Sequence, residues 1–393
     1  MKCSVNKRSK NKNYRGFRGG LMLKKLSIAI ATTVSLGANA DIKIADVAEL
    51  SGAGASAGSV WHDGVKLGYE EVNAAGGILG QKVDLVSYDS QTNPQNSRAM
   101  VQKAIDEGAY VLMGTVYSSS TVVNMLVAQQ NGIPQLTGSE SPTITAKGNP
   151  YIFRTNFGAQ KAMPKIGAFL ADELKVKNVA IIWPNTEYGK GGHDAFVNIA
   201  KQTGMELSVD LPTEQAQVDF AADVAKIKSS KAEAVFVYLT QEESARFLIE
   251  SRKQGLKIPI IGDGVLISNK VIELAGDAAN GALGHLALTP QADIPEIKRV
   301  AAKFKEKYGY EIDYNGLKGY LGAFTVKYVT EMVGELDREK FAQKMHGLCL
   351  DAKSYPGVLM DVCWDETGEM SRASFLVEVV DGKQQISKLL PAN

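Results

Sequence analysis

The chain has 393 residues, which is more than one domain usually holds, and its 45% hydrophobic and 22% charged residues are typical of a water-soluble globular protein. The formal net charge of +1 conceals an asymmetry, because residues 1–40 hold nine Lys and Arg and no acidic residue. Residues 41–393 therefore carry 35 basic and 43 acidic residues, a net charge of −8. Residues 41–393 are too acidic to offer the basic surface that nucleic acid requires, so we expect no nucleic-acid partner.

The first 40 residues have the pattern of a secretory signal peptide. Lys24 and Lys25 precede an apolar stretch at 26–36, and Ala38-Asn39-Ala40 follows as a cleavage site. We expect cleavage near Ala40 and a mature protein in the periplasm, with Met22 as a candidate true start. The alternative is an N-terminal membrane anchor, although the apolar stretch is short for a spanning helix.

From residue 41 onward, strand and helix patterns alternate. We expect strands at 42–47, 83–88, 110–113 and 133–136, and helices at 60–75, 94–107 and 122–130. Asn93 is a candidate cap for the second of these helices, with Pro94 at its first position. A βαβαβαβ order predicts a parallel sheet with helices on both faces.

The same alternation resumes after a polar passage at 137–158. We expect helices at 161–174, 194–202, 218–228 and 242–254, strands at 179–183, 207–211, 234–239 and 259–262, and a polar loop at 184–192. Later patterns predict helices at 294–308, 317–333 and 338–345, then strands at 358–364 and 375–380. The fold class is therefore α/β with two doubly wound lobes, the first comprising 41–157 plus about 285–365 and the second 158–284 plus about 366–393.

The run Gly114 to Thr121 is the most informative stretch of the sequence. A short apolar strand ends at Gly114, and three serines at 118–120 open the next helix. The first turn of a helix has unpaired N–H groups and partial positive charge, so this run predicts a site for a carboxylate. The plainer interpretation is that these serines only cap the helix.

The sequence carries few other chemical signals. Cys349 and Cys363 are the cysteines that remain after cleavage, and an even number outside the cytoplasm predicts one disulfide, with two free thiols as the alternative. The four histidines match no metal-ligand spacing, so we expect no metal and no cofactor. No Gly-x-Ser-x-Gly motif, phosphate loop or nucleophile–base pair appears, so we expect no enzymatic activity.

Several short motifs occur in an order that resembles the periplasmic substrate-binding proteins of branched-chain amino acid ABC transporters, the leucine/isoleucine/valine type. They are residues 50–54, 73–78, 88–91, Gly114 with 118–121, 151–155, Tyr188-Gly189 and 364–368, which together span the mature chain from 41 to about 378. The resemblance implies a type I periplasmic binding protein fold, in which two lobes are joined by a three-crossover hinge and close on a ligand.

The resemblance also implies roles for individual residues. Ser118 matches the serine that meets the ligand carboxylate, and Ser139 and Ser141 match the residues of the second loop that meet the carboxylate and the ammonium through backbone and hydroxyl groups. Tyr188 matches the aromatic residue that closes over the ligand, and Asp263 lies near the acidic residue that takes the ammonium. Tyr188 can instead pack under a helix, and Asp263 can instead cap one.

The first loop departs from the family pattern, because Ala57 stands where a Tyr is common. Trp61 can supply an aromatic wall in its place or pack in the core. The polar run at 240–242 is unlike a site for leucine. We therefore expect a monomer that delivers a small carboxylate-bearing solute, an amino acid of the branched-chain type, to a membrane permease. The alternatives are an aromatic acid, a short amide or urea, or a ligand-sensing role.

Overall fold

A computed structural model describes residues 41–392 of the chain, and its strands form two large sheets and one small sheet. The first sheet is parallel and has the strand order β2-β1-β3-β4-β5. Its strands are β1 (Ile42–Ala48), β2 (Val83–Asp89), β3 (Val111–Met113), β4 (Gln135–Thr137) and β5 (Ile152–Arg154). The expected βαβαβαβ order is confirmed.

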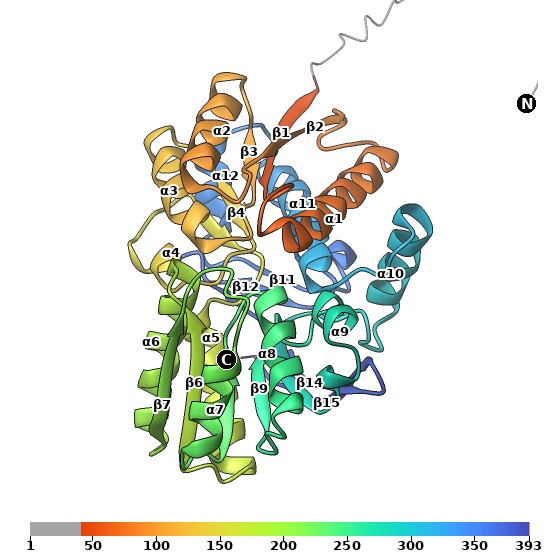
Figure 1. Cartoon of the computed structure of the whole chain (residues 1–393). Helices are drawn as coiled ribbons and strands as arrows, with labels where there is room; N and C mark the ends of the chain where they lie inside the picture. The colour runs from red at the N-terminus through yellow and green to blue at the C-terminus, as the bar shows by residue number, and fades with distance from the viewer. Residues whose placement is uncertain (1–40, 393) are drawn as a thin grey trace, which may run out of the picture. The chain divides into compact units, whose positions relative to one another are not determined.

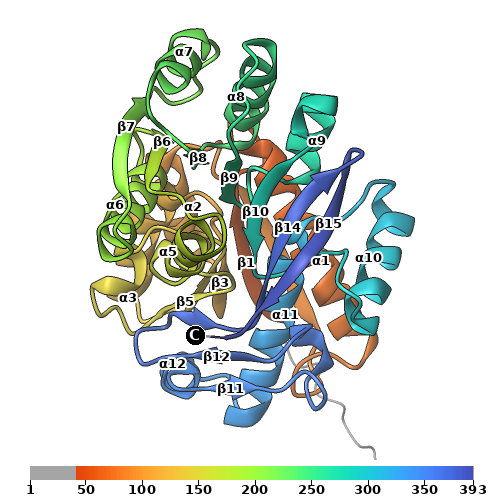
Figure 2. The same ribbon diagram turned by 90° about the horizontal axis from the view of Figure 1, so that it is seen from below.

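The second sheet has the order β15-β14-β10-β9-β8-β6-β7 and combines parallel strands with an antiparallel hairpin. Its strands are β6 (Asn178–Pro184), β7 (Glu206–Thr213), β8 (Ala234–Val237), β9 (Ile260–Asp263), β10 (Ala282–Leu286), β14 (Ser374–Val380) and β15 (Lys383–Leu390). Figure 2 shows the β14–β15 hairpin beside β10, with which β14 pairs antiparallel. The small sheet joins β11 (Cys349–Leu350), β12 (Val362–Trp364) and β13 (Met370–Ser371).

Helices follow most strands, as Figure 1 shows. They are α1 (Ala55–Ala74), α2 (Pro94–Asp106), α3 (Ser118–Gln130), α4 (Thr143–Ala146), α5 (Ala159–Ala168), α6 (Glu187–Gln202), α7 (Ala221–Ser229), α8 (Gln241–Lys253), α9 (Asn269–Ala275), α10 (Pro295–Tyr308), α11 (Tyr314–Val333) and α12 (Arg338–Met345). Asn93 caps α2 by accepting from the N–H groups of Gln95 and Asn96, as expected.

Both large sheets are covered on both faces, which explains the apolar composition of their strands. In β1, Ile44 belongs to one hydrophobic cluster while Ala45 and Val47 belong to another. In β6, Ile182 and Ile181 divide between two clusters in the same way. Successive side chains of a strand point to opposite faces, so a strand buried on both faces is apolar throughout.

Two of the expected boundaries were wrong for identifiable reasons. Residues 184–192 do not form a polar loop, because Thr186 accepts a hydrogen bond from Gly189 N and starts α6 at Glu187. Residues 356–358 form a short 3₁₀ turn instead of a strand, so β12 begins only at Val362. The first correction matters for the site, because it places Tyr188 in the first turn of a helix.

The first and second sheets are joined by three passages of the chain. The chain passes from the first sheet to the second after β5. After β10 it returns to the first sheet through α10 and α11, and it passes to the second sheet again between β13 and β14. α11 packs closely on α1, and a Cβ added to Gly64 would lie 2.0 Å from the carbonyl oxygen of Gly316. The predicted fold class, two doubly wound units with three crossovers, is confirmed. Within residues 41–392, no helix has the length and apolar content needed to span a bilayer.

Candidate functional site

A cavity of about 190 Å³ lies where loops of the first sheet, loops of the second sheet and α11 meet. Most of the residues that line it lie at or just beyond the carboxyl end of a strand, which is where open α/β sheets bind ligands. The lining residues are Ala57, Thr92, Pro94, Val116, Tyr117, Ser118, Ser119, Ser120, Gly138, Glu140, Thr186, Tyr188, Gln215, Thr240, Gln241, Val265, Tyr314 and Lys318.

The start of α3 forms one wall of this cavity. Ser118 begins the helix without a side-chain cap at Tyr117, and Ser118 to Ser120 all line the cavity. Ser118 Oγ accepts from Ser141 N at 3.2 Å and from Glu140 N at 3.3 Å. A hydroxyl that accepts two hydrogen bonds still has its own proton to donate, so Ser118 can donate to an anion beside the positive end of the helix.

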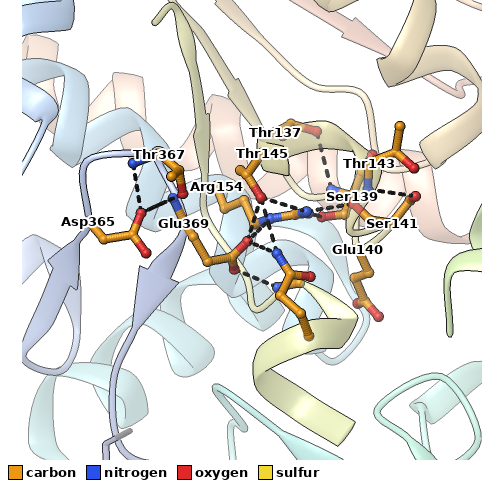
Figure 3. Close-up of polar contacts among 12 residues, drawn as sticks. Thr137, Ser139, Glu140, Ser141, Thr143, Thr145, Arg154, Asp365, Thr367 and Glu369 are labelled. Carbon is orange, nitrogen blue, oxygen red and sulfur yellow. Dashed lines mark hydrogen bonds and ion pairs between the residues drawn. The ribbon is translucent and has the colours of Figure 1, made fainter. Parts of the chain in front are cut away.

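A buried arginine holds the neighbouring loop, as Figure 3 shows. Arg154 Nε donates to Glu369 Oε2 at 2.6 Å, and its terminal nitrogens donate to the carbonyl oxygens of Ser139 and Ser141. Arg154 is fully buried. Glu140 lies between these two serines, and its side chain points away from the arginine in Figure 3. The arginine therefore fixes the backbone from which Glu140 reaches the cavity.

Two acidic side chains from opposite sheets meet beside the cavity. The Glu140 carboxyl is within hydrogen-bonding reach of Asp263, the last residue of β9. Burial raises the pKa of Glu140, and the Lys318 charge opposes this rise. Burial also raises the pKa of Asp263, and the neighbouring Glu140 charge raises it further. Each carboxyl therefore favours its protonated form more than an exposed acid does.

Lys318 brings a positive charge to the same region from the first turns of α11. Its Nζ donates to Gly138 O at 3.1 Å and lies 4.6 Å from the centre of the Tyr314 ring. Lys318 is 1% exposed, and burial lowers its pKa, whereas the Glu140 charge acts in the opposite direction. The Lys318 charge therefore compensates part of the negative charge of the two carboxyls.

The structure separates the sequence-predicted residues into two groups. Ser118 and Tyr188 line the cavity, and Tyr188 OH donates to Asp263 Oδ2 at 2.6 Å. Asp263 lines a smaller cavity on the other side of Glu140. These residues come from different strands and helices and are brought together only by the fold.

Ser139, Ser141 and Trp61 do not line the cavity. Ser139 Oγ donates to Val116 O at 2.8 Å, and Ser141 Oγ donates to Glu187 Oε1 at 2.8 Å, so each hydroxyl already has an acceptor. Trp61 is fully buried, and its indole N–H donates to Asp46 Oδ1 at 3.0 Å. Of the two interpretations considered for Trp61, core packing is the one that the structure supports.

Sequence reasoning missed Glu140, Lys318, Tyr314 and Gln241. Glu140 lies in a loop that was expected at the site, flanked by two candidate serines, and its charge was the signal that went unused. Lys318 and Tyr314 belong to a helix far along the chain, and nothing in the local pattern connects them to the first sheet. Gln241 was noticed only as part of a polar run.

Cys349 and Cys363 are joined by a disulfide, with 2.01 Å between their sulfur atoms. The bond links β11 to β12 in the small sheet, away from the cavity. Among residues 41–392, no group of three or more His, Cys, Asp or Glu side chains is arranged to hold a metal ion.

The fold and the site define a solute-binding protein with a cavity between two α/β units. A family model described as periplasmic binding protein matches residues 41–384, and the chain belongs to that family. The family assignment made from the motifs is thereby confirmed. The chain is a solute-binding protein of the ABC-transporter type, and the family works outside the cytoplasm.

Similar proteins cover nearly the whole chain. A leucine-, isoleucine-, valine-, threonine- and alanine-binding protein of Pseudomonas aeruginosa is 27% identical over 353 residues, which are 89% of this chain and 93% of that protein. A second protein of the same organism, an amino acid binding protein, is 28% identical over 379 residues, 95% of this chain and 98% of its own.

Solved structures agree on the fold. A leucine binding protein from Thermotoga maritima superimposes with a TM-score of 0.81 at 23% identity, covering 89% of this chain and 99% of that one. A solute binding protein from R. palustris in complex with benzoate gives a TM-score of 0.80 at 22% identity, covering 90% and 98%. At these identities the likeness extends to the fold and not to the ligand.

Proposed function

We propose that this protein captures a small α-amino acid, of the branched-chain type or of similar size, and delivers it to the permease of an ABC importer. One observation carries the proposal: the cavity has a helix start suited to an anion at one wall and, at another, the buried Glu140 carboxyl, which neighbours the buried Asp263 carboxyl and suits a cation. An α-amino acid presents these two charges on adjacent atoms.

In this arrangement the ligand carboxylate lies on the first turn of α3. It accepts from the Ser118 hydroxyl and from the free N–H groups of that turn, where the helix dipole adds favourable potential. The ammonium lies toward Glu140 and Asp263, because burying a cation requires an anionic partner. The cavity volume of about 190 Å³ suits a solute of this size.

The two lobes would close on the solute. We assign 41–157 with about 285–365 to the first lobe and 158–284 with about 366–393 to the second. Contacts across the cavity support such closure: Ser56 Oγ donates to Gln241 Oε1 at 2.6 Å, and Ser141 Oγ donates to Glu187 Oε1. Ligand would shift the equilibrium toward the closed form by its greater affinity for it.

The names of the relatives support an amino acid, since one of them covers leucine, isoleucine, valine, threonine and alanine. A specific observation also favours a second candidate, an aromatic acid. Three tyrosine rings (Tyr117, Tyr188 and Tyr314) line the cavity, and one solved structure with this fold holds benzoate. An aromatic acid would use the helix start but would leave the carboxyl pair without a cation.

Calorimetric titration of the mature protein, refolded to remove any co-purified solute, tests the proposal. We expect micromolar or tighter binding of at least one of leucine, isoleucine, valine, threonine and alanine. Absence of binding across this panel would contradict an amino-acid ligand, and binding of benzoate instead would establish the second candidate.

Asp263→Asn separates the two candidates on one protein. Asparagine keeps an acceptor for Tyr188 OH but carries no negative charge, so amino-acid affinity should fall about tenfold or more. Benzoate has no ammonium, and its affinity should change little. Asp277→Asn, on an exposed 3₁₀ turn, is the matched control.

The proposal also includes cleavage of a signal peptide, a monomeric state and a role in import. The predicted signal peptide lies outside the described residues, and N-terminal sequencing of periplasmic protein should begin near residue 41. Light scattering should give the mass of a monomer. Genes for a permease and an ATPase beside this one would support import over ligand sensing.

A further inference from the structure

Glu140 lines two cavities, and Asp263 lines the smaller of them. Glu140 and Tyr314 line both the main cavity and a small cavity of about 20 Å³, while Asp263 lines only the small one. Glu140 follows β4 of the first sheet, whereas Asp263 ends β9 of the second. Their contact therefore joins the two halves of the protein at the wall of the ligand cavity.

Each carboxyl of the pair also accepts hydrogen bonds from other groups. Asn156 Nδ2 donates to Glu140 Oε1 at 2.7 Å. Asp263 accepts from Tyr188 OH at 2.6 Å and from Val265 N at 3.0 Å. Where the two carboxyls face each other, neither brings a donor unless one of them is protonated. Two like charges in one buried site are costly, so such pairs hold a shared proton.

The charged groups around the pair do not remove the need for that proton. Lys318 and Arg154 bring positive charge, but Lys318 donates to Gly138 O and Arg154 is engaged by Glu369. The rings of Tyr188, Tyr238 and Tyr314 face the pair, and burial raises the pKa of each, which keeps them neutral. Lys318 also interacts with Asp313, a buried acid whose pKa is raised by burial.

Two more titratable groups, His285 and Glu49, lie near this region. His285 pairs in register with Asp263 on the adjacent strand, and burial lowers the pKa of His285 to about 3, so it stays neutral. Glu49 lies behind Val116 and Tyr117, and burial raises the pKa of Glu49 to about 7. Glu49 is therefore the other nearby acid that can exchange a proton near neutral pH.

An independent observation indicates that the cavity receives a polar ligand group. Gln241 lines the cavity and is 3% exposed. Its side-chain oxygen accepts from Ser56, but its amide nitrogen has no hydrogen-bond partner among the described residues. A buried donor without an acceptor is rare in proteins, and a ligand that offers an oxygen would satisfy it.

We propose that Glu140 shares one proton with Asp263 before a ligand binds, and that the ammonium of the solute replaces this proton, so that capture of each solute molecule releases one proton. The inference rests on the proposed function, because it requires a solute with an ammonium group. It assigns to Glu140 the role of a specificity-determining residue.

The step is balanced in charge and atoms. The O–H bond of the acid in the pair breaks and its proton passes to the solvent. The two carboxylates then accept hydrogen bonds from the N–H groups of the ammonium, and Lys318 offsets the additional negative charge. A solute without an ammonium cannot replace the proton, so the pair discriminates against simple carboxylic acids.

Calorimetry in two buffers of different ionisation enthalpy tests the release. The probe is the tightest binder among leucine, threonine and alanine, measured at slightly acidic pH. We expect the apparent binding enthalpy to change with the buffer by the amount for one released proton, and the affinity to rise about tenfold per pH unit while the pair stays protonated. A binding enthalpy that is the same in both buffers would overturn the inference.

Variants identify the source of the proton. Glu140→Gln should abolish the release and weaken binding by tenfold or more, whereas Glu49→Gln and the exposed α10 variant Glu306→Gln should retain the release. Release that persists in Glu140→Gln, or disappears in Glu49→Gln, would assign the proton to another group and overturn the proposal.

A ligand-independent measurement keeps this inference separate from the proposed function. Infrared difference spectra between wild type and Glu140→Gln at neutral pH should show one protonated carboxyl lost in the variant. If no amino acid binds to the wild-type protein, the proposed function fails while this spectrum still decides whether the pair holds a proton. A spectrum without that band would overturn the shared proton even if amino acids bind.

Discussion

Arg154 Nε donates to Glu369 Oε2 at 2.6 Å although the two residues are 215 positions apart, and both side chains are almost completely buried. The pair joins β5 of the first sheet to the segment just before β13. Glu369 also accepts from Gly158 N at 2.8 Å and from Gln160 at 2.6 Å. This cluster fixes the segments where the chain leaves the first sheet, and it fixes the loop that carries Glu140.

Arg154→Met should lower the free energy of unfolding by about 3–5 kcal/mol, because it leaves the Glu369 carboxylate buried without a cation. Urea denaturation measures the change. The matched control is Lys231→Met, which removes an exposed ion pair with Glu206 and should cost less than about 1 kcal/mol. Equal losses in the two variants would contradict a structural role for the buried pair. The double variant with Glu369→Gln should recover part of the loss.

Ser118→Ala should weaken amino-acid binding about tenfold, because the charged ligand carboxylate loses the hydrogen bond that the Ser118 hydroxyl donates. Stability should also fall by about 1 kcal/mol, since Glu140 N and Ser141 N lose their acceptor. Calorimetric titration and urea denaturation measure the two effects separately. Ser229→Ala, on the exposed end of α7, is the control and should leave both unchanged. Unchanged affinity in Ser118→Ala would contradict the assignment of the carboxylate to this helix.

Glu49 should make the protein less stable as the pH rises toward neutrality. Burial raises the pKa of Glu49 from 4.5 to about 7, so the folded state holds its proton more tightly than the unfolded state does. This contribution is fully present below pH 4.5 and is lost as the pH rises through about 7. Its size is on the order of 3 kcal/mol.

The difference in unfolding free energy between wild type and Glu49→Gln, followed by urea denaturation across this pH range, isolates that contribution. Glutamine does not titrate, and its one oxygen replaces one of the two carboxylate oxygens that accept from Val116 N and Tyr117 N, a loss that is independent of pH. Glu306→Gln, on the exposed face of α10, should follow the wild-type pH dependence. A wild-type curve parallel to that of Glu49→Gln would show that the pKa of Glu49 is the same in the folded and unfolded states, which would contradict the prediction.

Removing the disulfide should reduce stability by about 3 kcal/mol, because Cys349 and Cys363 close a loop of 14 residues in the unfolded chain. The paired variant Cys349→Ser with Cys363→Ser, measured by thermal unfolding, tests this. Amino-acid affinity should stay within about twofold, since the small sheet does not line the cavity. A large loss of affinity at full folding would indicate that the small sheet takes part in closure.

The sequence determined the class of fold and the location of one wall of the site, because both depend on local patterns. Apolar strand runs alternating with amphipathic helices require parallel sheets covered on both faces, and the serines after Gly114 had to begin a helix at a strand end. Tyr188 also belonged to a recognisable local motif, although the helix start at Glu187 was missed.

Only the tertiary structure decided which side chains meet. The resemblance implied that Ser139 and Ser141 contact the ligand through backbone and hydroxyl groups, but their hydroxyls donate to Val116 O and Glu187 Oε1. Lys318 reaches Gly138 from 180 positions away, and Glu140 meets Asp263 across two sheets. Periodicity specifies which face of an element is buried, whereas partners distant in sequence depend on how the elements pack, and the charges in this cavity come from such distant partners.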